Sequence, residues 1–174
     1  MTAESLYLDA LEALEADDRE EALLHARKAI KLDPEHADAW RVVSDASLPG
    51  LRKQPTLKQA ASSLSAAKKV VALQPDDLAM WVRGGRLLSD ELGLYMDALQ
   101  WWQDARHHAP EEVTPIVEQA AILADMGLYG EASERLQSII DENMDLATTQ
   151  YTRVARLHQM CKLCLLYTSP SPRD

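Results

Sequence analysis

The spacing of three prolines constrains the fold of this 174-residue chain more than any other feature. Each proline follows a segment with helical periodicity, and 41 and then 35 residues separate Pro34, Pro75 and Pro110. The stretch Glu21–Trp40 shows the pattern most clearly. Its alanines at 22, 26 and 29 share one helical face, Pro34 cannot continue the helix, and a new apolar run opens at Trp40. The pattern predicts a repeated unit of helix, stop and helix.

Four further positions keep constant offsets from these stops, with Met144 in the place of a fourth stop. An early position of the first helix holds Leu6, Trp40, Trp81 and Ile116, and then Gln150. The second helix has a small position with Ala22, Ser63, Ala98 and Ala132, and a larger one with Ala26, Ala67, Trp102 and Leu136. The next small position holds Ala29, Val70, Ala105 and Ile139. Because the four positions agree on one register, the repeat does not depend on any single match.

This register resembles the tetratricopeptide repeat (TPR), a helix–turn–helix unit of about 34 residues. The resemblance implies an all-α, right-handed superhelical solenoid over residues 1–163. Repeats are expected at about 3–36, 37–77, 78–112 and 113–146, with a partial fifth at 147–163. An insertion falls around Leu48–Pro55 in the second repeat, after which Thr56 is expected to cap a helix that runs to about Leu73.

Several local features follow from the same alignment. Trp40, Trp81 and Trp102 are expected to wedge between helices. Trp101 shares its position with mostly polar residues, so we expect it to be partly exposed, either packed over a neighbouring helix or touching a partner. Thr114 is expected to cap a helix whose first turn contains Pro115. The turn at Ala16–Arg19 stands where the family usually has a glycine.

Composition and charge exclude some classes of function. The chain has 28 acidic and 18 basic residues and a net charge of −10, which disfavours a nucleic-acid partner, because phosphate binding depends on Lys and Arg. The acidic N-terminal segment lacks the basic region of a secretory signal, and no apolar run is long enough to span a membrane. A cytoplasmic protein is predicted.

The last eleven residues, Cys164–Asp174, resemble the in-frame translation of a common transposase sequencing adapter. Helical patterning is expected to stop at Leu163, before a Ser/Pro-rich end. We therefore interpret residues 164–174 as a non-native tail and expect the natural chain to continue beyond the junction. The pair Cys161-x-x-Cys164 would then be half foreign, and with no second pair it is a weak metal or redox signal.

The sequence contains no motif for catalysis or for a cofactor. A phosphate-binding glycine loop, a G-x-S-x-G elbow and an H-E-x-x-H pair are all missing. His107 and His108 are adjacent, so on a helix they point about 100° apart and are poorly placed to chelate one ion. A non-enzymatic protein without metal or cofactor is predicted.

The resemblance also implies a binding surface, because first helices line the concave face of a TPR array. The corresponding positions here are Tyr7, Leu11, Arg41, Asp45, Val82, Arg86, Val117, Ala121, Tyr151 and Ala155. Tyr7 and Leu11 replace the polar residues with which chaperone-binding TPRs clamp a terminal carboxylate, so that clamp is absent. Arg41 and Arg86 are candidates to bind an acidic group, unless they pair with Asp38, Asp45 or Asp90 instead.

The predicted function is a non-catalytic interaction module that binds a peptide or helix of another protein. Three alternatives remain open. In the first, the chain is the N-terminal interaction arm of a larger enzyme. In the second, it is an RNA-binding helical repeat, which the negative charge disfavours. In the third, it is a protein that self-assembles through the last helix. The sequence specifies neither the partner nor the oligomeric state.

Overall fold

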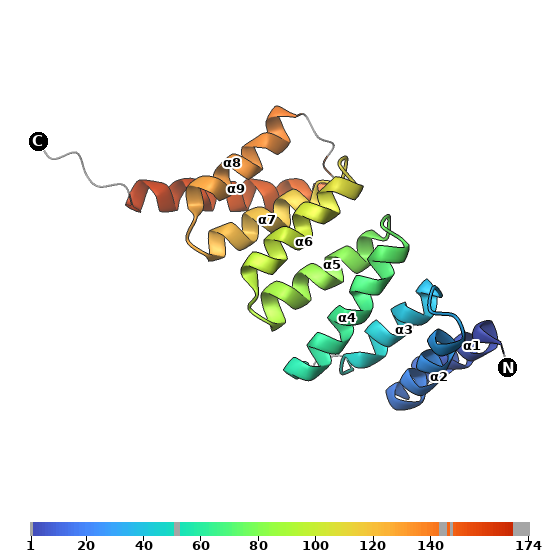
Figure 1. Ribbon diagram of the computed structural model, residues 1–174. Helices are drawn as coiled ribbons and strands as arrows, with labels where there is room; N and C mark the ends of the chain where they lie inside the picture. The colour runs from blue at the N-terminus through green and yellow to red at the C-terminus, as the bar shows by residue number, and fades with distance from the viewer. Residues whose placement is uncertain (1, 51–52, 143–145, 147, 169–174) are drawn as a thin grey trace, which may run out of the picture. The chain divides into compact units, whose positions relative to one another are not determined.

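The computed structural model describes residues 2–50, 53–142, 146 and 148–168, and all regular structure within these residues is helical (Figure 1). Met144, the predicted fourth stop, and residues 169–174 of the predicted tail lie outside them. The chain divides into two compact units, Met1–Asp97 and Ala98–Asp174. The helices are α1 (Ala3–Glu15), α2 (Arg19–Leu32), α3 (Ala37–Ser47), α4 (Leu57–Leu73), α5 (Leu78–Arg86), α6 (Tyr95–His108), α7 (Thr114–Asp125), α8 (Tyr129–Asp141) and α9 (Thr148–Thr168), with a π-helical turn η1 (Leu87–Glu91) after α5.

The prolines stop the helices as predicted. Helices α2, α4 and α6 end at Leu32, Leu73 and His108, just before the three prolines. A residue that precedes proline is pushed out of the α region, and Asp33 accordingly has an extended φ of −136°. Within the first unit α1 packs on α2, α2 on α3, α3 on α4 and α4 on α5; within the second, α7 packs on α8 and α8 on α9.

The helix starts confirm one predicted cap and correct another. Thr56 caps α4, and the side chain of Gln59 bonds back to the Thr56 backbone, which completes a capping box. The prediction that Thr114 caps α7 is wrong, because Thr114 is already the first helical residue and Val113 precedes it without a side-chain cap. Pro115 does lie in the first turn, where its missing N–H costs nothing. The predicted helix end at Leu163 is also wrong, because α9 continues to Thr168.

The turns between paired helices share one backbone conformation. Gly93 and Gly127 have positive φ angles of 65° and 79°. Asp17, in the turn where the family usually has a glycine, has a φ of 58°. Aspartate is one of the few residues that tolerate this left-handed region, so it can replace glycine there.

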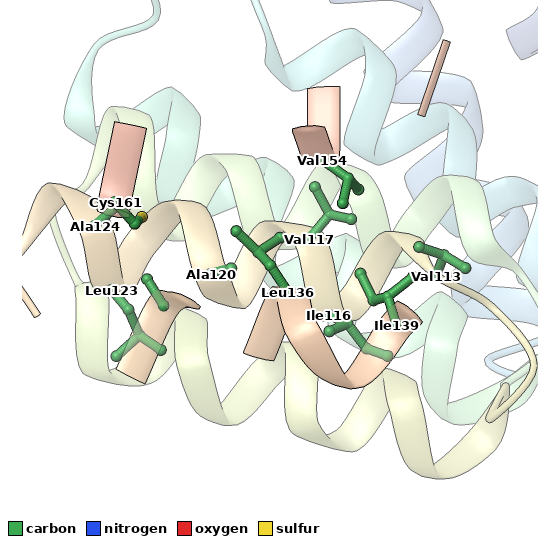
Figure 2. Packing of buried hydrophobic residues seen from close by; sticks show 11 residues of the cluster. Val113, Ile116, Val117, Ala120, Leu123, Ala124, Leu136, Ile139, Val154 and Cys161 are labelled. Atoms are coloured by element: carbon green, nitrogen blue, oxygen red, sulfur yellow. The ribbon is translucent and has the colours of Figure 1, made fainter. Parts of the chain in front are cut away.

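The two units are built on different cores. Around α1–α3 the buried cluster is dominated by alanines, namely Ala10, Ala13, Ala22, Ala26, Ala46 and Ala66, with Val42 and Val43. In the second unit larger side chains of α7 and α8 meet Val154 and Cys161 of α9 (Figure 2). Leu136 and Ile139 face Ile116 and Val117 at the centre of this cluster, which holds the three helices together.

The tryptophans are placed largely as the register predicts. Trp81 and Trp102 are 5% and 1% exposed, and Trp40 is half-buried. The indole Nε1 of Trp40 donates to the carbonyl of Pro34 at 2.9 Å, and that of Trp81 donates to Pro75 at 2.8 Å. Each of these two tryptophans is thus hydrogen-bonded to the proline that precedes its helix. The expectation that Trp101 is partly exposed is wrong, since it is only 7% exposed and therefore packs within the protein.

Candidate functional site

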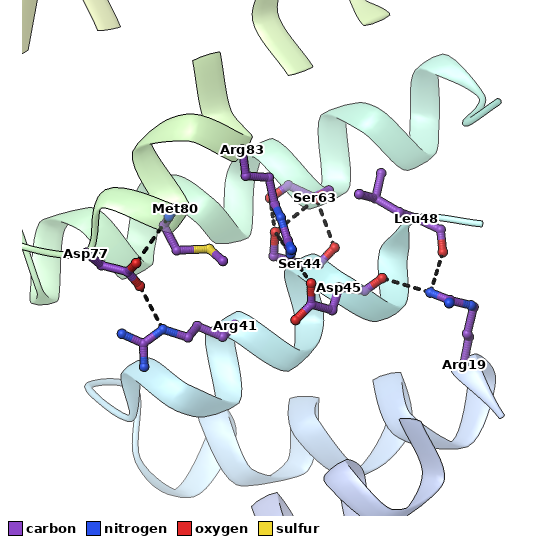
Figure 3. A network of polar contacts seen from close by, with 9 residues as sticks. All are labelled: Arg19, Arg41, Ser44, Asp45, Leu48, Ser63, Asp77, Met80 and Arg83. Atoms are coloured by element: carbon purple, nitrogen blue, oxygen red, sulfur yellow. Dashed lines mark hydrogen bonds and ion pairs between the residues drawn. The ribbon is translucent and has the colours of Figure 1, made fainter. Parts of the chain in front are cut away.

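The first predicted binding residue with a clear role is Arg41, which joins two consecutive repeats. Its Nε donates to Oδ2 of Asp77 at 2.7 Å, and its guanidinium also contacts Asp38 and the side-chain carbonyl of Gln74. Partial burial opposes ionisation, but the bond to Asp77 and the charges of Asp77 and Asp38 outweigh it and raise the pKa of Arg41. Asp77 in turn caps α5 through the amide of Met80 (Figure 3). The guanidinium of Arg41 is therefore bonded to residues of this protein and holds the two repeats together.

Asp45, another predicted binding residue, is committed in the same way. Its carboxylate forms an ion pair with Arg83, and Arg83 also reaches Oγ of Ser44 at 3.4 Å (Figure 3). The backbone carbonyls of Asp45 and Leu48 accept bonds from Arg19 at 3.0 and 2.8 Å. These contacts fix the end of α3 against α2 and α5.

A buried pair of serines, Ser44 and Ser63, joins α3 to α4. The hydroxyls of Ser44 and Ser63 lie 2.9 Å apart, and each also donates to the backbone carbonyl of the other residue. Both residues are fully buried. Because buried hydroxyls are costly without partners, this reciprocal arrangement holds α3 and α4 in one register.

A groove lies between the end of α3 and the exposed face of α5. It has a volume of about 330 Å³ and is lined by Leu48, Ala79, Val82, Arg83, Arg86, Leu87 and Glu91. Among the predicted binding residues, Val82 and Arg86 lie here. Arg86 is exposed, and within the described part of the chain it has no ion-pair partner. The groove thus combines an apolar wall with one guanidinium, that of Arg86, and one carboxylate, that of Glu91, neither of which has an ion-pair partner among the described residues.

The remaining predicted residues of the first unit belong partly to its core. Tyr7 is half-buried, and its ring centroid lies 5.0 Å from that of His36. Burial, followed by the charges of Asp38 and Glu4, raises the pKa of Tyr7. Leu11 packs against the alanine-rich cluster. Both residues support the first repeat and leave only part of their surface accessible.

In the second unit the predicted residues fall into three different environments. Val117 is 2% exposed and lies in the core of Figure 2, so its assignment to a binding face is wrong. Ala121 is half-buried. Tyr151 is 63% exposed and, with Ala155, lines a second groove of about 290 Å³ along α9. Ile140, Leu146, Val154, His158, Gln159 and Lys162 complete this groove.

Sequence reasoning missed part of the groove between α3 and α5 for an identifiable reason. Ala79, Val82 and Arg86 recur at i, i+3 and i+7, so the helical periodicity of α5 does contain the signal for one wall. Leu48 lies in the insertion that follows α3, where no helical periodicity applies. Leu87 and Glu91 lie on the π-helical turn, whose period differs from that of an α-helix.

The described residues carry no arrangement suited to catalysis by a metal. They include no group of three or more His, Cys, Asp or Glu side chains that could hold a metal ion. No helix among them is both long and apolar enough to cross a membrane. What the first groove offers chemically is apolar contact, a charge-assisted hydrogen bond from Arg86 and, at Glu91, a carboxylate that can accept one.

These helices, stops and turns define an all-α helical-repeat protein. No protein-family model matches the sequence, and no curated protein matches it. Solved structures do resemble it. A MamA double mutant (RS-1) is 21% identical, with 91% of this chain and 76% of that chain covered and a TM-score of 0.60.

Two solved TPR proteins are similar to a comparable degree. TTC0263 of Thermus thermophilus, a thermophilic TPR protein, is 17% identical over 95% of this chain and 82% of its own, with a TM-score of 0.54. YrrB, described as a TPR protein with an unusual peptide-binding site, is 16% identical over 91% of this chain and 87% of its own, with a TM-score of 0.56. The fold of this chain is that of an all-α TPR array.

Proposed function

We propose that this protein is a non-catalytic interaction module that binds an acidic, partly apolar peptide segment of another protein in the groove between α3 and α5. The observation that carries the proposal is the unequal state of the arginines around this groove. Arg83 in the groove lining is paired with Asp45 of α3, and Arg41, outside the lining, is paired with Asp38 and Asp77, whereas Arg86 is exposed without such a partner in the same lining as Val82 and Leu87. An exposed cation next to an apolar wall suits a ligand with a carboxylate close to an aliphatic or aromatic side chain.

The shape of the groove supports a segment rather than a whole folded surface. Its volume of about 330 Å³ admits one or two side chains, as in other modes of peptide recognition in grooves. YrrB, which is similar in fold, is described as having a peptide-binding site, and this agrees with a peptide as the ligand class. Tyr7, Leu11, Ala121 and Tyr151 remain proposed outer contacts for longer partners.

A peptide selection followed by affinity measurements tests the proposal. Peptides selected from a random displayed library on the full chain should be enriched in Asp or Glu beside a large apolar residue. Their affinity, measured by calorimetry, should fall about tenfold or more with Arg86→Glu, because a charge-assisted bond is replaced by repulsion. Val82→Glu should also weaken binding. Arg27→Glu, which changes an exposed arginine on α2 outside the groove lining, is the matched control and should leave affinity unchanged.

The outcomes separate the alternatives. Selected peptides that bind equally well to the wild type and to the Arg86→Glu and Val82→Glu variants would show that this groove is not the binding site. A selection that yields no acidic, apolar consensus would contradict the proposed ligand class.

A further inference from the structure

The two terminal elements of the chain carry opposite charge. Helix α1 contains Glu4, Asp9, Glu12 and Glu15 and no lysine or arginine. Helix α9 contains Arg153, Arg156 and Lys162 and no aspartate or glutamate. Helices α4 and α5 likewise carry lysine or arginine and no aspartate or glutamate, whereas α1 is wholly acidic.

The basic helix also borders a groove with an unused polar atom. The groove of about 290 Å³ is formed by apolar side chains of α8 and α9, including Ile140, Val154 and the exposed Tyr151. His158 lines it and is only 8% exposed, and its Nε2 has no hydrogen-bond partner among the described residues. A buried polar atom without a partner is costly.

The cations of α9 differ in how far they are neutralised. Arg153 forms a two-bond ion pair with Glu118 of α7, at 2.6 and 2.9 Å. Arg156 and Lys162 are exposed and have no ion-pair partner within the described residues. Lys162 lines the groove, and Arg156 lies on the same helix outside the groove lining.

Helix α1 presents a complementary stripe. Leu8, Glu12 and Glu15 follow at i, i+4 and i+7, so they share one face, and all three are exposed. Leu8 is 54% exposed. Glu4 and Asp9 lie near His36 and His25, whereas Glu12 and Glu15 have no ion-pair partner within the described residues. An apolar side chain followed by two carboxylates complements an apolar groove whose helix carries Lys162 in the lining and Arg156 outside it.

We infer that the α8–α9 groove of one copy binds the acidic face of α1 of a second copy, with Leu8 in the groove and Glu12 and Glu15 against Arg156 and Lys162. The two patches differ, so the contact is heterologous: each copy offers one of each, and copies add head to tail. The inference does not depend on the peptide groove between α3 and α5.

Sedimentation velocity of the full chain over a range of concentrations tests the inference. The wild type should associate, and added NaCl should weaken the association because the contact is ionic in part. Reversing either patch, with Glu12→Lys/Glu15→Lys or with Arg156→Glu/Lys162→Glu, should weaken association about tenfold or more. The chain that carries all four substitutions should regain association, because the charges are exchanged and the net charge of the wild type is restored. Circular dichroism verifies that each variant is folded.

Three further variants sharpen the test. Leu8→Asp should abolish association, whereas Leu24→Asp, at a residue of α2 with a closely similar exposure of 53%, should not. A chain that ends at Leu163 should associate as the full chain does, since none of the proposed contacts lies beyond it. A monomeric wild type, loss of association in the shortened chain, or failure of the four-substitution chain to associate would each overturn the inference. An effect of the α9 substitutions alone would point to a symmetric α9–α9 contact and would overturn it as well.

Discussion

The bond between each early tryptophan and the preceding proline carbonyl allows a quantitative prediction. Both indoles donate to the proline six residues earlier, but the two sites differ in burial. Trp81 is 5% exposed and its bond to Pro75 is partly buried, whereas Trp40 is half-buried and its bond to Pro34 is exposed. The same substitution at the two positions therefore removes the same hydrogen bond, once from a partly buried site and once from an exposed one.

Replacement by phenylalanine removes the indole N–H and part of the ring. At Trp81 we expect a loss of about 1–2 kcal/mol, of which about 1 kcal/mol comes from the bond and the rest from apolar contact. At Trp40 the freed carbonyl of Pro34 can bind water, so the loss should stay below about 1 kcal/mol. Truncation of Trp81 to alanine should cost about 3–5 kcal/mol, and truncation of Trp40 clearly less.

Urea unfolding followed by far-UV circular dichroism measures these differences, with stability taken from the midpoint and the slope of each transition. Circular dichroism is preferred to fluorescence because the substitutions remove tryptophans themselves. The reasoning would be refuted if Trp40→Phe proved as destabilising as Trp81→Phe, or if Trp81→Phe changed stability no more than an ordinary surface substitution.

Three further predictions concern a turn, a histidine and a thiol. Gly127→Ala should destabilise by about 1–2 kcal/mol in the same urea assay because Gly127 has a φ of 79°, whereas Gly130→Ala, in open space within α8, should be neutral or stabilising. Burial and the charge of Lys162 lower the pKa of His158, so its imidazole binds a proton more readily in the unfolded chain than in the folded one. The free energy of unfolding should therefore fall as the pH drops below about 6.5. His158→Gln should flatten this fall when unfolding is measured across pH. Burial raises the pKa of the Cys161 thiol, which is 0% exposed, so iodoacetamide should leave Cys161 unmodified in the folded chain and label it in urea; mass spectrometry that finds it modified in the native protein would contradict this.

Much of the fold could be predicted from the sequence because its signals are local. Proline stops, the cap at Thr56 and the register of small residues depend only on neighbours in the chain, and the helix ends at Leu32 and Leu73 confirm them. Trp101 shows where the local argument fails. Its position holds polar residues in the other copies, yet it is 7% exposed, because packing is decided by the elements that surround a side chain.

The candidate site could be predicted only in part, because availability for binding depends on contacts between repeats. The register placed Arg41, Asp45 and Arg86 among the candidate binding residues. It did not show that Arg41 is held by Asp77, thirty-six residues away in sequence, or that Asp45 is held by Arg83. Periodicity alone also assigned Val117 to the binding face, although it belongs to the core shared by α7, α8 and α9.

The register places residues of the opposite charge at the positions of the Asp45–Arg83 pair in the following repeats. Asp45 lies five residues after Trp40, and its partner Arg83 lies two residues after Trp81. At the same offsets in the following repeats, Arg86 would correspond to Asp45 and Glu118 to Arg83. Both carboxylate oxygens of Glu118, however, are bound by Arg153 of α9, so this carboxylate is already committed within the second unit. The repeated positions thus carry different contacts in different repeats, so the availability of a residue for binding depends on the contacts within its own unit.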